Sequence, residues 1–138
     1  MFVHWGLYAL TEIQDQAFSR MEIPREEYES LVHKFNPVGY DPEKWVLLAK
    51  SAGMEYICFT TKHHDGFCMW DTKETDYNIM NTPYGKDTLK MLADACQKHG
   101  MKLSLYYSCP DWHHEYGFNP ASTHQWKAKT ENGIDTKR

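Results

Sequence analysis

The chain has 138 residues, of which 41% are hydrophobic and 25% charged, and a formal net charge of -4. This composition is ordinary for a globular domain with one core. The weak negative charge and the scattered lysines exclude a basic surface for nucleic acid, and no apolar run approaches the ~20 residues that span a bilayer, so we expect no nucleic-acid partner and no membrane partner.

The first predicted strand covers Phe2 to Trp5 and ends at Gly6. Residues 7–21 have little helical periodicity and are predicted to form a long loop. A helix is expected from Pro24 to Phe35, because a proline in the first turn is followed by acidic residues near the positive end of the helix dipole.

A second helix has clearer boundaries. Asp41 is placed to cap its free amides, Pro42 takes its first turn and Gly53 ends it. Its apolar face is expected to consist of Trp45, Leu48, Ala49 and Ala52. The strand predicted next, residues 54–61 (MEYICFTT), has apolar residues at both odd and even positions, as is typical of a parallel strand covered on both sides.

A third helix and a third strand follow. The helix is predicted over residues 87–99 and ends at Gly100, and the strand is predicted over residues 101–108 (MKLSLYYS). The last stretch, residues 128–138, is charged and aperiodic and is predicted to be a loop or a frayed end. The order of strand, helix, strand, helix and strand indicates an α/β fold with a parallel sheet.

The polar, aromatic and histidine-rich pieces of the chain all follow the carboxyl ends of predicted strands, where α/β folds place active sites. His4 follows the first strand, and His63 and His64 follow the second. Both histidines of the pair can face a pocket where the strand gives way to a loop, and neutral imidazoles offer a donor and an acceptor that match vicinal hydroxyls. The structural alternative is that one turns inward and the other caps backbone.

Alternation along the third strand separates its side chains. Leu103 and Leu105 are expected to pack against helices, which leaves Tyr106 on the interior face as the pocket tyrosine. Trp5 and Trp112 are possible platforms for a sugar ring, but a tryptophan near a strand end is at least as often a core residue.

Metal binding is the rival interpretation of so many histidines. The side chains that it would use are His63, His64, His113 and His114 with Asp65, Asp111 or Glu115. Adjacent histidines converge poorly on one ion, and zinc motifs space their ligands by two or more residues. The sequence also lacks the GxGxxG, GxxxxGK[ST] and GxSxG motifs. We therefore expect no metal and no cofactor.

Several segments, taken in chain order, resemble glycoside hydrolase family 29, the α-L-fucosidases. They are HWGLY near the start, IPREEY and FNP after it, TTKHHDGFCMWDTKETDYN in the middle, GKD before the third helix, and GMKLSLYYSCPDWHHE. The resemblance implies a partial (β/α)8 TIM-like barrel of which this chain supplies the first three β/α units. Residues 1–138 would then be the N-terminal portion of a glycoside hydrolase catalytic domain.

The resemblance also implies a reaction, the retaining hydrolysis of terminal α-L-fucosyl residues, and a fucosylated glycan or glycoconjugate as partner. The residues that match the family positions holding the fucose hydroxyls are His4, His63, His64 and Tyr106. Many members carry a Glu-Trp pair in the loop after HWG. This chain has QDQAFS there, at residues 14–19, so that part of the pocket is expected to be built differently.

The resemblance places the catalytic residues outside the sequence. The family nucleophile is an aspartate on a later strand and the acid/base is a glutamate later still, and both would fall beyond Arg138. Retaining hydrolysis needs two carboxyls ~5 to 5.5 Å apart, so we expect little or no hydrolysis by this chain alone. The compartment stays open, because the family is often secreted, periplasmic or lysosomal and the start of this chain lacks the pattern of a signal peptide.

Two other functions are weighed against this one. A non-catalytic sugar-binding or assembly module is possible because three strands leave two open edges, which favour self-association. A metal enzyme built on the histidine pairs is the other.

Overall fold

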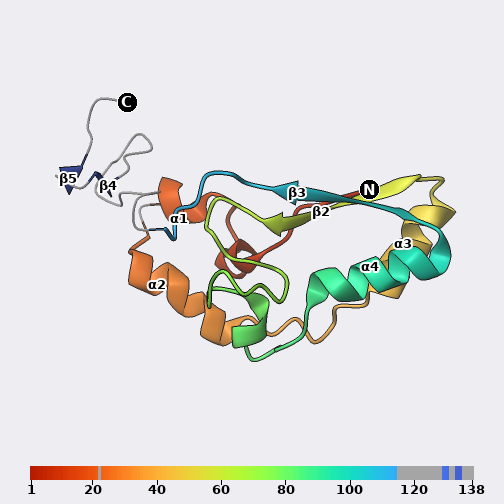
Figure 1. Cartoon of the computed structure of the whole chain (residues 1–138), viewed down its shortest axis with the longest axis horizontal. Coiled ribbons are helices and arrows are strands. Elements are labelled where there is room, and N and C mark those ends of the chain that lie inside the picture. The colour runs from red at the N-terminus through yellow and green to blue at the C-terminus, as the bar shows by residue number, and fades with distance from the viewer. Residues whose placement is uncertain (22, 115–128, 131–132, 135–138) are drawn as a thin grey trace.

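The computed structural model describes residues 1–21, 23–114, 129–130 and 133–134. Its main sheet has three parallel strands in the order β1 (Phe2–Val3), β2 (Tyr56–Lys62) and β3 (Lys102–Tyr107). The predicted α/β class with a parallel sheet is confirmed. The carboxyl ends of β2 and β3 point toward the side of the molecule that holds α1 and α2 (Figure 1).

Two long helices pack side by side on one face of the sheet (Figure 1). They are α3 (Pro42–Ser51) and α4 (Thr88–His99). Asp41 caps α3 by accepting a hydrogen bond from the amide of Lys44 at 3.0 Å, and Asp87 caps α4 through the amide of Lys90 at 2.7 Å. Both predicted helices therefore begin at the acidic residue that their sequence pattern indicated.

The segment between β1 and α3 differs from its prediction. Residues 7–21 were expected to be loop, but they contain the 3-10 helix η1 (Leu7–Thr11) and the short helix α1 (Ala17–Arg20). The single helix expected over residues 24–35 is divided into α2 (Arg25–Glu29) and the 3-10 helix η2 (Ser30–Lys34). Short turns of this kind are stabilised mainly by tertiary packing, which periodicity does not reveal.

The remaining elements are small. The 3-10 helix η3 (Ile79–Asn81) lies between β2 and α4, and β4 (Lys129–Thr130) pairs antiparallel with β5 (Gly133–Ile134). The loop predicted over residues 128–138 thus contains two short strands, and its other residues lie outside the described part of the chain. No described helix is both long and apolar enough to cross a membrane.

The core lies between the sheet and the helices and continues under the loop after β1. Its fully buried members include Ile57, Phe59 and Leu92. Several expectations about burial were wrong. Leu48 is 63% exposed, Ala52 is exposed as well, and Leu105 is 55% exposed. The strand expected to be covered on both sides has Tyr56 exposed on one of them. Leu48 lies on the outer side of α3. Leu105 faces the helix side as predicted, but β3 is an edge strand among the described residues and no described helix covers it there.

The opposite face of the sheet is open. We define the open face by Phe2, Tyr56, Cys58 and Ser104, which share one side of the paired strands. Phe2 and Tyr56 are 55% and 54% exposed, large values for aromatic side chains on a central sheet. Among the described residues, no helix lies over this face (Figure 1).

An irregularity near the end of β2 decides which side chains reach the open face. Thr60 pairs with Tyr106 and Lys62 pairs with Tyr107, so Thr61 is an extra residue in the ladder. Strict alternation would put Lys62 on the open face and His63 among the helices. The bulge reverses this placement and brings His63 to the side of Tyr106.

The cap of α4 provides a first test of the fold. Replacing Asp87 with alanine is expected to lower the free energy of unfolding by about 1 to 2 kcal/mol, because Asp87 accepts from the amides of Lys90 and Asp71. Urea unfolding measures the loss. The control is Asp94→Ala on the same helix, which removes only the exposed pair with Lys90 and should cost under about 0.5 kcal/mol. Equal losses in the two variants would contradict the capping role.

Candidate functional site

Three predicted site residues meet at the carboxyl ends of the strands. His63 lies between the other two, with its ring centroid 4.9 Å from that of His4 and 5.7 Å from that of Tyr106, on which it stacks at 20°. His63 is buried, Tyr106 is half-buried and His4 is exposed. The hydroxyl of Tyr106 shares a hydrogen bond of 3.1 Å with Ser108.

Two further residues belong to this group and were not predicted from the sequence. A carboxylate oxygen of Asp15, in the loop between η1 and α1, lies 3.7 Å from Nε2 of His4 and 3.5 Å from Nε2 of His63. The hydroxyl of Tyr8, on η1, lies 2.8 Å from Nδ1 of His4. Tyr8 ends the HWGLY segment, and Asp15 falls in the segment where the family resemblance predicted a differently built pocket, but the sequence assigned neither residue to the site.

A small cavity opens beside this group. It has a volume of about 310 Å³ and is lined by His4, Tyr8, Ala9, Glu12, Ile13, Gln14 and Asp15. The side chains of His4 and Asp15 are 36% and 33% exposed, so both can reach a ligand from solvent. Their polar atoms point to the same space from two different elements.

The buried histidine of the group is neutral near pH 7. Burial, with help from the neighbouring His64 and His4, lowers the pKa of His63 to about 4. Its Nδ1 atom is buried and has no hydrogen-bond partner among the described residues. A neutral ring with an unsatisfied nitrogen is suited to exchanging hydrogen bonds with a hydroxyl-rich ligand.

The remaining predicted residues lie around this group in different ways. The ring of His64 is 4.3 Å from that of His63 and 5.2 Å from that of Trp112. Trp112 is 3% exposed, which favours a core role. Trp5 packs against aromatic rings on the helix side of the sheet, namely Phe35, Tyr40, Trp45 and Phe59. A sugar-stacking role for either tryptophan has no support in this placement.

Two aspartates fix the loops that follow β2 and β3. Asp65 accepts hydrogen bonds from the hydroxyl of Tyr28 at 2.7 Å and from the amide of Phe67 at 3.2 Å. Asp111 accepts from the amides of His113 and His114, both at 3.0 Å. Both aspartates thus hold loop backbone in place, the role expected of an aspartate in a turn.

A buried lysine connects the ends of β2 and β3. The ammonium of Lys62 donates to the carbonyl of Ser108 at 2.9 Å and lies 3.2 Å from the carboxylate of Asp111. It also lies over the ring of Tyr107, 4.8 Å from the centroid. Lys62 thereby fixes the loop after β3 relative to the histidine pair.

Two buried groups of this region, Asp65 and His63, should give opposite pH dependences. Burial raises the pKa of Asp65 to about 6, although its hydrogen bond from Tyr28 opposes the shift. The folded chain therefore binds more protons than the unfolded chain between about pH 4 and 6 at Asp65, and fewer between about pH 4 and 6.5 at His63. Raising the pH lowers the stability contributed by Asp65 and raises that contributed by His63.

We expect single substitutions to separate these contributions. As the pH rises from 4 to 6, the free energy of unfolding of His63→Gln should fall relative to that of the parent. Over the same range the free energy of unfolding of Asp65→Asn should rise relative to that of the parent, and each change should be on the order of 2 kcal/mol. Urea unfolding at intervals across this range measures both slopes. Parallel pH profiles for the two variants and the parent would contradict the assignment.

The metal site weighed from the sequence is not assembled in the described residues. His113 instead stacks on Tyr77 at 4.3 Å and pairs with Glu29 at 2.8 Å. Glu115 lies outside the described part of the chain.

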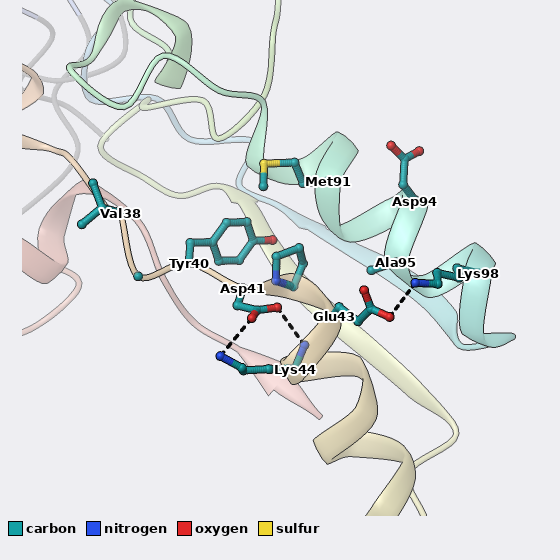
Figure 2. Close-up of a pocket in the computed structure, with 11 residues that line it drawn as sticks. Val38, Tyr40, Asp41, Glu43, Lys44, Met91, Asp94, Ala95 and Lys98 are labelled. Carbon is teal, nitrogen blue, oxygen red and sulfur yellow. Dashed lines mark hydrogen bonds and ion pairs between the residues drawn. The ribbon is translucent and has the colours of Figure 1, made fainter.

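A larger groove of about 670 Å³ lies away from the predicted site, between the start of α3 and the side of α4. Figure 2 shows that charged side chains line it, with Glu43 and Lys98 paired across it at 2.7 Å. None of the predicted site residues contributes to this groove.

Comparison with known proteins gives one consistent result. The alpha-L-fucosidase family model matches residues 1–135. Alpha-L-fucosidase isoenzyme 1 from Paenibacillus thiaminolyticus is 49% identical with a TM-score of 0.83, over 86% of this chain and 28% of that one. Alpha-L-fucosidase AlfC from Lactobacillus casei, solved with its alpha-L-fucose product, is 43% identical with a TM-score of 0.80, over 86% of this chain and 40% of that one.

A third solved structure is the alpha-L-fucosidase of Bacteroides thetaiotaomicron, trapped as a covalent intermediate. It is 37% identical with a TM-score of 0.78, over 80% of this chain and 28% of that one. The chain spans between 17% and 29% of the length of the curated relatives that it matches. On the family model and these similarities, the chain belongs to the alpha-L-fucosidase family.

Proposed function

We propose that residues 1–138 form the N-terminal portion of an alpha-L-fucosidase catalytic domain, the first three β/α units of a (β/α)8 TIM-like barrel. The open face of the sheet would then be the barrel interior, which is why Phe2 and Tyr56 are exposed in the isolated chain. In this arrangement the carboxyl ends of the strands form one wall of the active site.

The function that this wall supports best is binding of a terminal α-L-fucosyl residue of a glycan or glycoconjugate. The observation that carries the proposal is the convergence of His4, His63, Tyr106 and Asp15 at the strand ends. A neutral imidazole, a phenol and a carboxylate together supply donors and acceptors for adjacent sugar hydroxyls. His64 would extend the same wall toward Trp112.

The proposal assigns no catalytic carboxylate to this chain. The retaining mechanism requires a nucleophile and an acid/base ~5 to 5.5 Å apart on the two sides of the scissile bond. Asp65 is buried and bonded to Tyr28, and Asp111 is bonded to backbone amides and Lys62. Neither is available for the attack, and the family resemblance places both catalytic groups beyond Arg138.

The test combines binding and turnover on the 138-residue chain. Calorimetric titration with L-fucose should show binding that weakens about tenfold to 100-fold in His63→Gln and in Asp15→Asn, because each variant leaves sugar hydroxyls poorly paired. His33→Gln, at an exposed histidine on η2, is the matched control and should bind as the parent does. Turnover of an aryl fucoside at about 1 per second or more would contradict the assignment of catalysis elsewhere.

A non-catalytic assembly module is the second candidate. It is favoured by the open face and by the uncovered edge strand β3, where Leu105 and Tyr107 are 55% and 56% exposed. Such a surface favours self-association through the sheet edges. Light scattering would detect it, and a monodisperse monomer at high concentration would exclude it.

A further inference from the structure

Three potential metal ligands converge at the candidate site from separate parts of the chain. They are His4 after β1, Asp15 in the loop before α1, and His63 after β2, and their ligating atoms lie within 4.8 Å of one another. Spacing along the chain does not predict this group, because its three members are far apart in the sequence. Among the described residues, no other group of three such side chains meets this spacing.

Two of the three separations are close to those that a small divalent ion imposes. Ligand bonds of ~2.0 to 2.2 Å in tetrahedral geometry place ligand atoms about 3.4 Å apart. The oxygen of Asp15 already lies 3.5 Å from Nε2 of His63 and 3.7 Å from Nε2 of His4. Small rotations of the partly exposed His4 and Asp15 would complete the approach to buried His63.

The surroundings also fit a metal site. Nδ1 of His4 has the hydroxyl of Tyr8 at 2.8 Å, which can accept from Nδ1–H and so leave Nε2 free to bind an ion. Two imidazoles and one carboxylate neutralise half the charge of a divalent cation and leave a position for water. The adjoining cavity gives the ion a path from solvent.

We propose that His4, Asp15 and His63 bind one divalent transition-metal ion, Zn²⁺ in particular, in place of the sugar. Mixed nitrogen and oxygen ligands favour Zn²⁺ or Co²⁺ over Mg²⁺ and Ca²⁺, which take mainly oxygen. The ion is an antagonist of sugar binding and not a cofactor, because it occupies the polar atoms that would otherwise pair with hydroxyls. The antagonism rests on the proposed function, whereas the metal site itself does not.

The experiment titrates the 138-residue chain with CoCl₂, whose visible absorption intensifies when protein ligands replace water, and then displaces the Co²⁺ with ZnCl₂. We expect one ion per chain. Asp15→Asn and His4→Gln should each weaken binding at least about tenfold, and Tyr8→Phe about tenfold to 100-fold through loss of the supporting hydrogen bond. His33→Gln should bind as the parent does. Circular dichroism confirms that each variant is folded.

The outcomes separate the metal site from the sugar site. Absence of stoichiometric Co²⁺ and Zn²⁺ binding, or binding that persists in both Asp15→Asn and His4→Gln, overturns the metal site. Zn²⁺ binding that L-fucose weakens supports both proposals. Zn²⁺ binding at these residues without any L-fucose binding keeps the metal site and removes the proposed sugar site.

Discussion

Gly66→Ala is expected to destabilise the chain by about 3 kcal/mol or more and to disorganise the histidine loop. Gly66 has a φ of 82°, a conformation that disfavours any side chain with a Cβ. A Cβ atom there would lie 2.5 Å from an oxygen of Asp111 and 2.6 Å from Cβ of His113. The new methyl group would therefore push the loops after β2 and β3 apart.

A matched glycine separates strain from steric conflict. Gly100 ends α4 with a φ of 64°, but a Cβ added there meets no atom within 4 Å. Gly100→Ala should cost only about 1 kcal/mol. Urea unfolding compares the two variants. A Gly66→Ala chain no less stable than Gly100→Ala would show that the two loops are not packed as described.

Lys62→Met is expected to lower the free energy of unfolding by about 3 kcal/mol, which is the second of the two largest predicted effects. Methionine fills similar space but leaves the carbonyl of Ser108 and the carboxylate of Asp111 without the ammonium that they contact. The Lys62 side chain is only 5% exposed, so water cannot easily replace it, although Asp111 keeps its bonds to backbone amides.

The control for this variant is an exposed lysine with a similar partner. Lys73 pairs with Asp71 at 2.9 Å, but its side chain is 84% exposed. Lys73→Met should change the free energy of unfolding by under about 1 kcal/mol. Thermal or urea unfolding of both variants measures the difference. A loss for Lys62→Met as small as that for Lys73→Met would mean that the buried lysine does not hold the two strand ends together.

The elements with strong local signals could be predicted from the sequence. Asp41 and Asp87 cap the helices whose starts they marked, and β2 and β3 pair in parallel as the order of elements indicated, although the described residues cover neither strand on both sides. Prediction failed where packing between distant segments decides the conformation. Residues 7–21 form short helices because tertiary contacts stabilise them, and the exposure of Leu105 depends on what lies beside an edge strand.

The candidate site shows the same division. His4, His63 and Tyr106 could be selected from their positions at strand ends, and the structure brings them together. Asp15 could not be selected from the sequence, because only the fold of the loop after β1 places its carboxylate beside two histidines. The bulge at Thr61 could not be predicted from the sequence either, yet it determines that His63 and not Lys62 faces Tyr106.

The most direct test of the central claim follows the histidine rings of the chain by NMR during a titration with L-fucose. We predict that the imidazole resonances of His4, His63 and His64 shift together and saturate, while that of His33, exposed on η2, stays unchanged. L-rhamnose, which has a different arrangement of hydroxyls, should produce smaller shifts. Unchanged resonances for all three site histidines at saturating L-fucose would contradict the proposed sugar-binding wall.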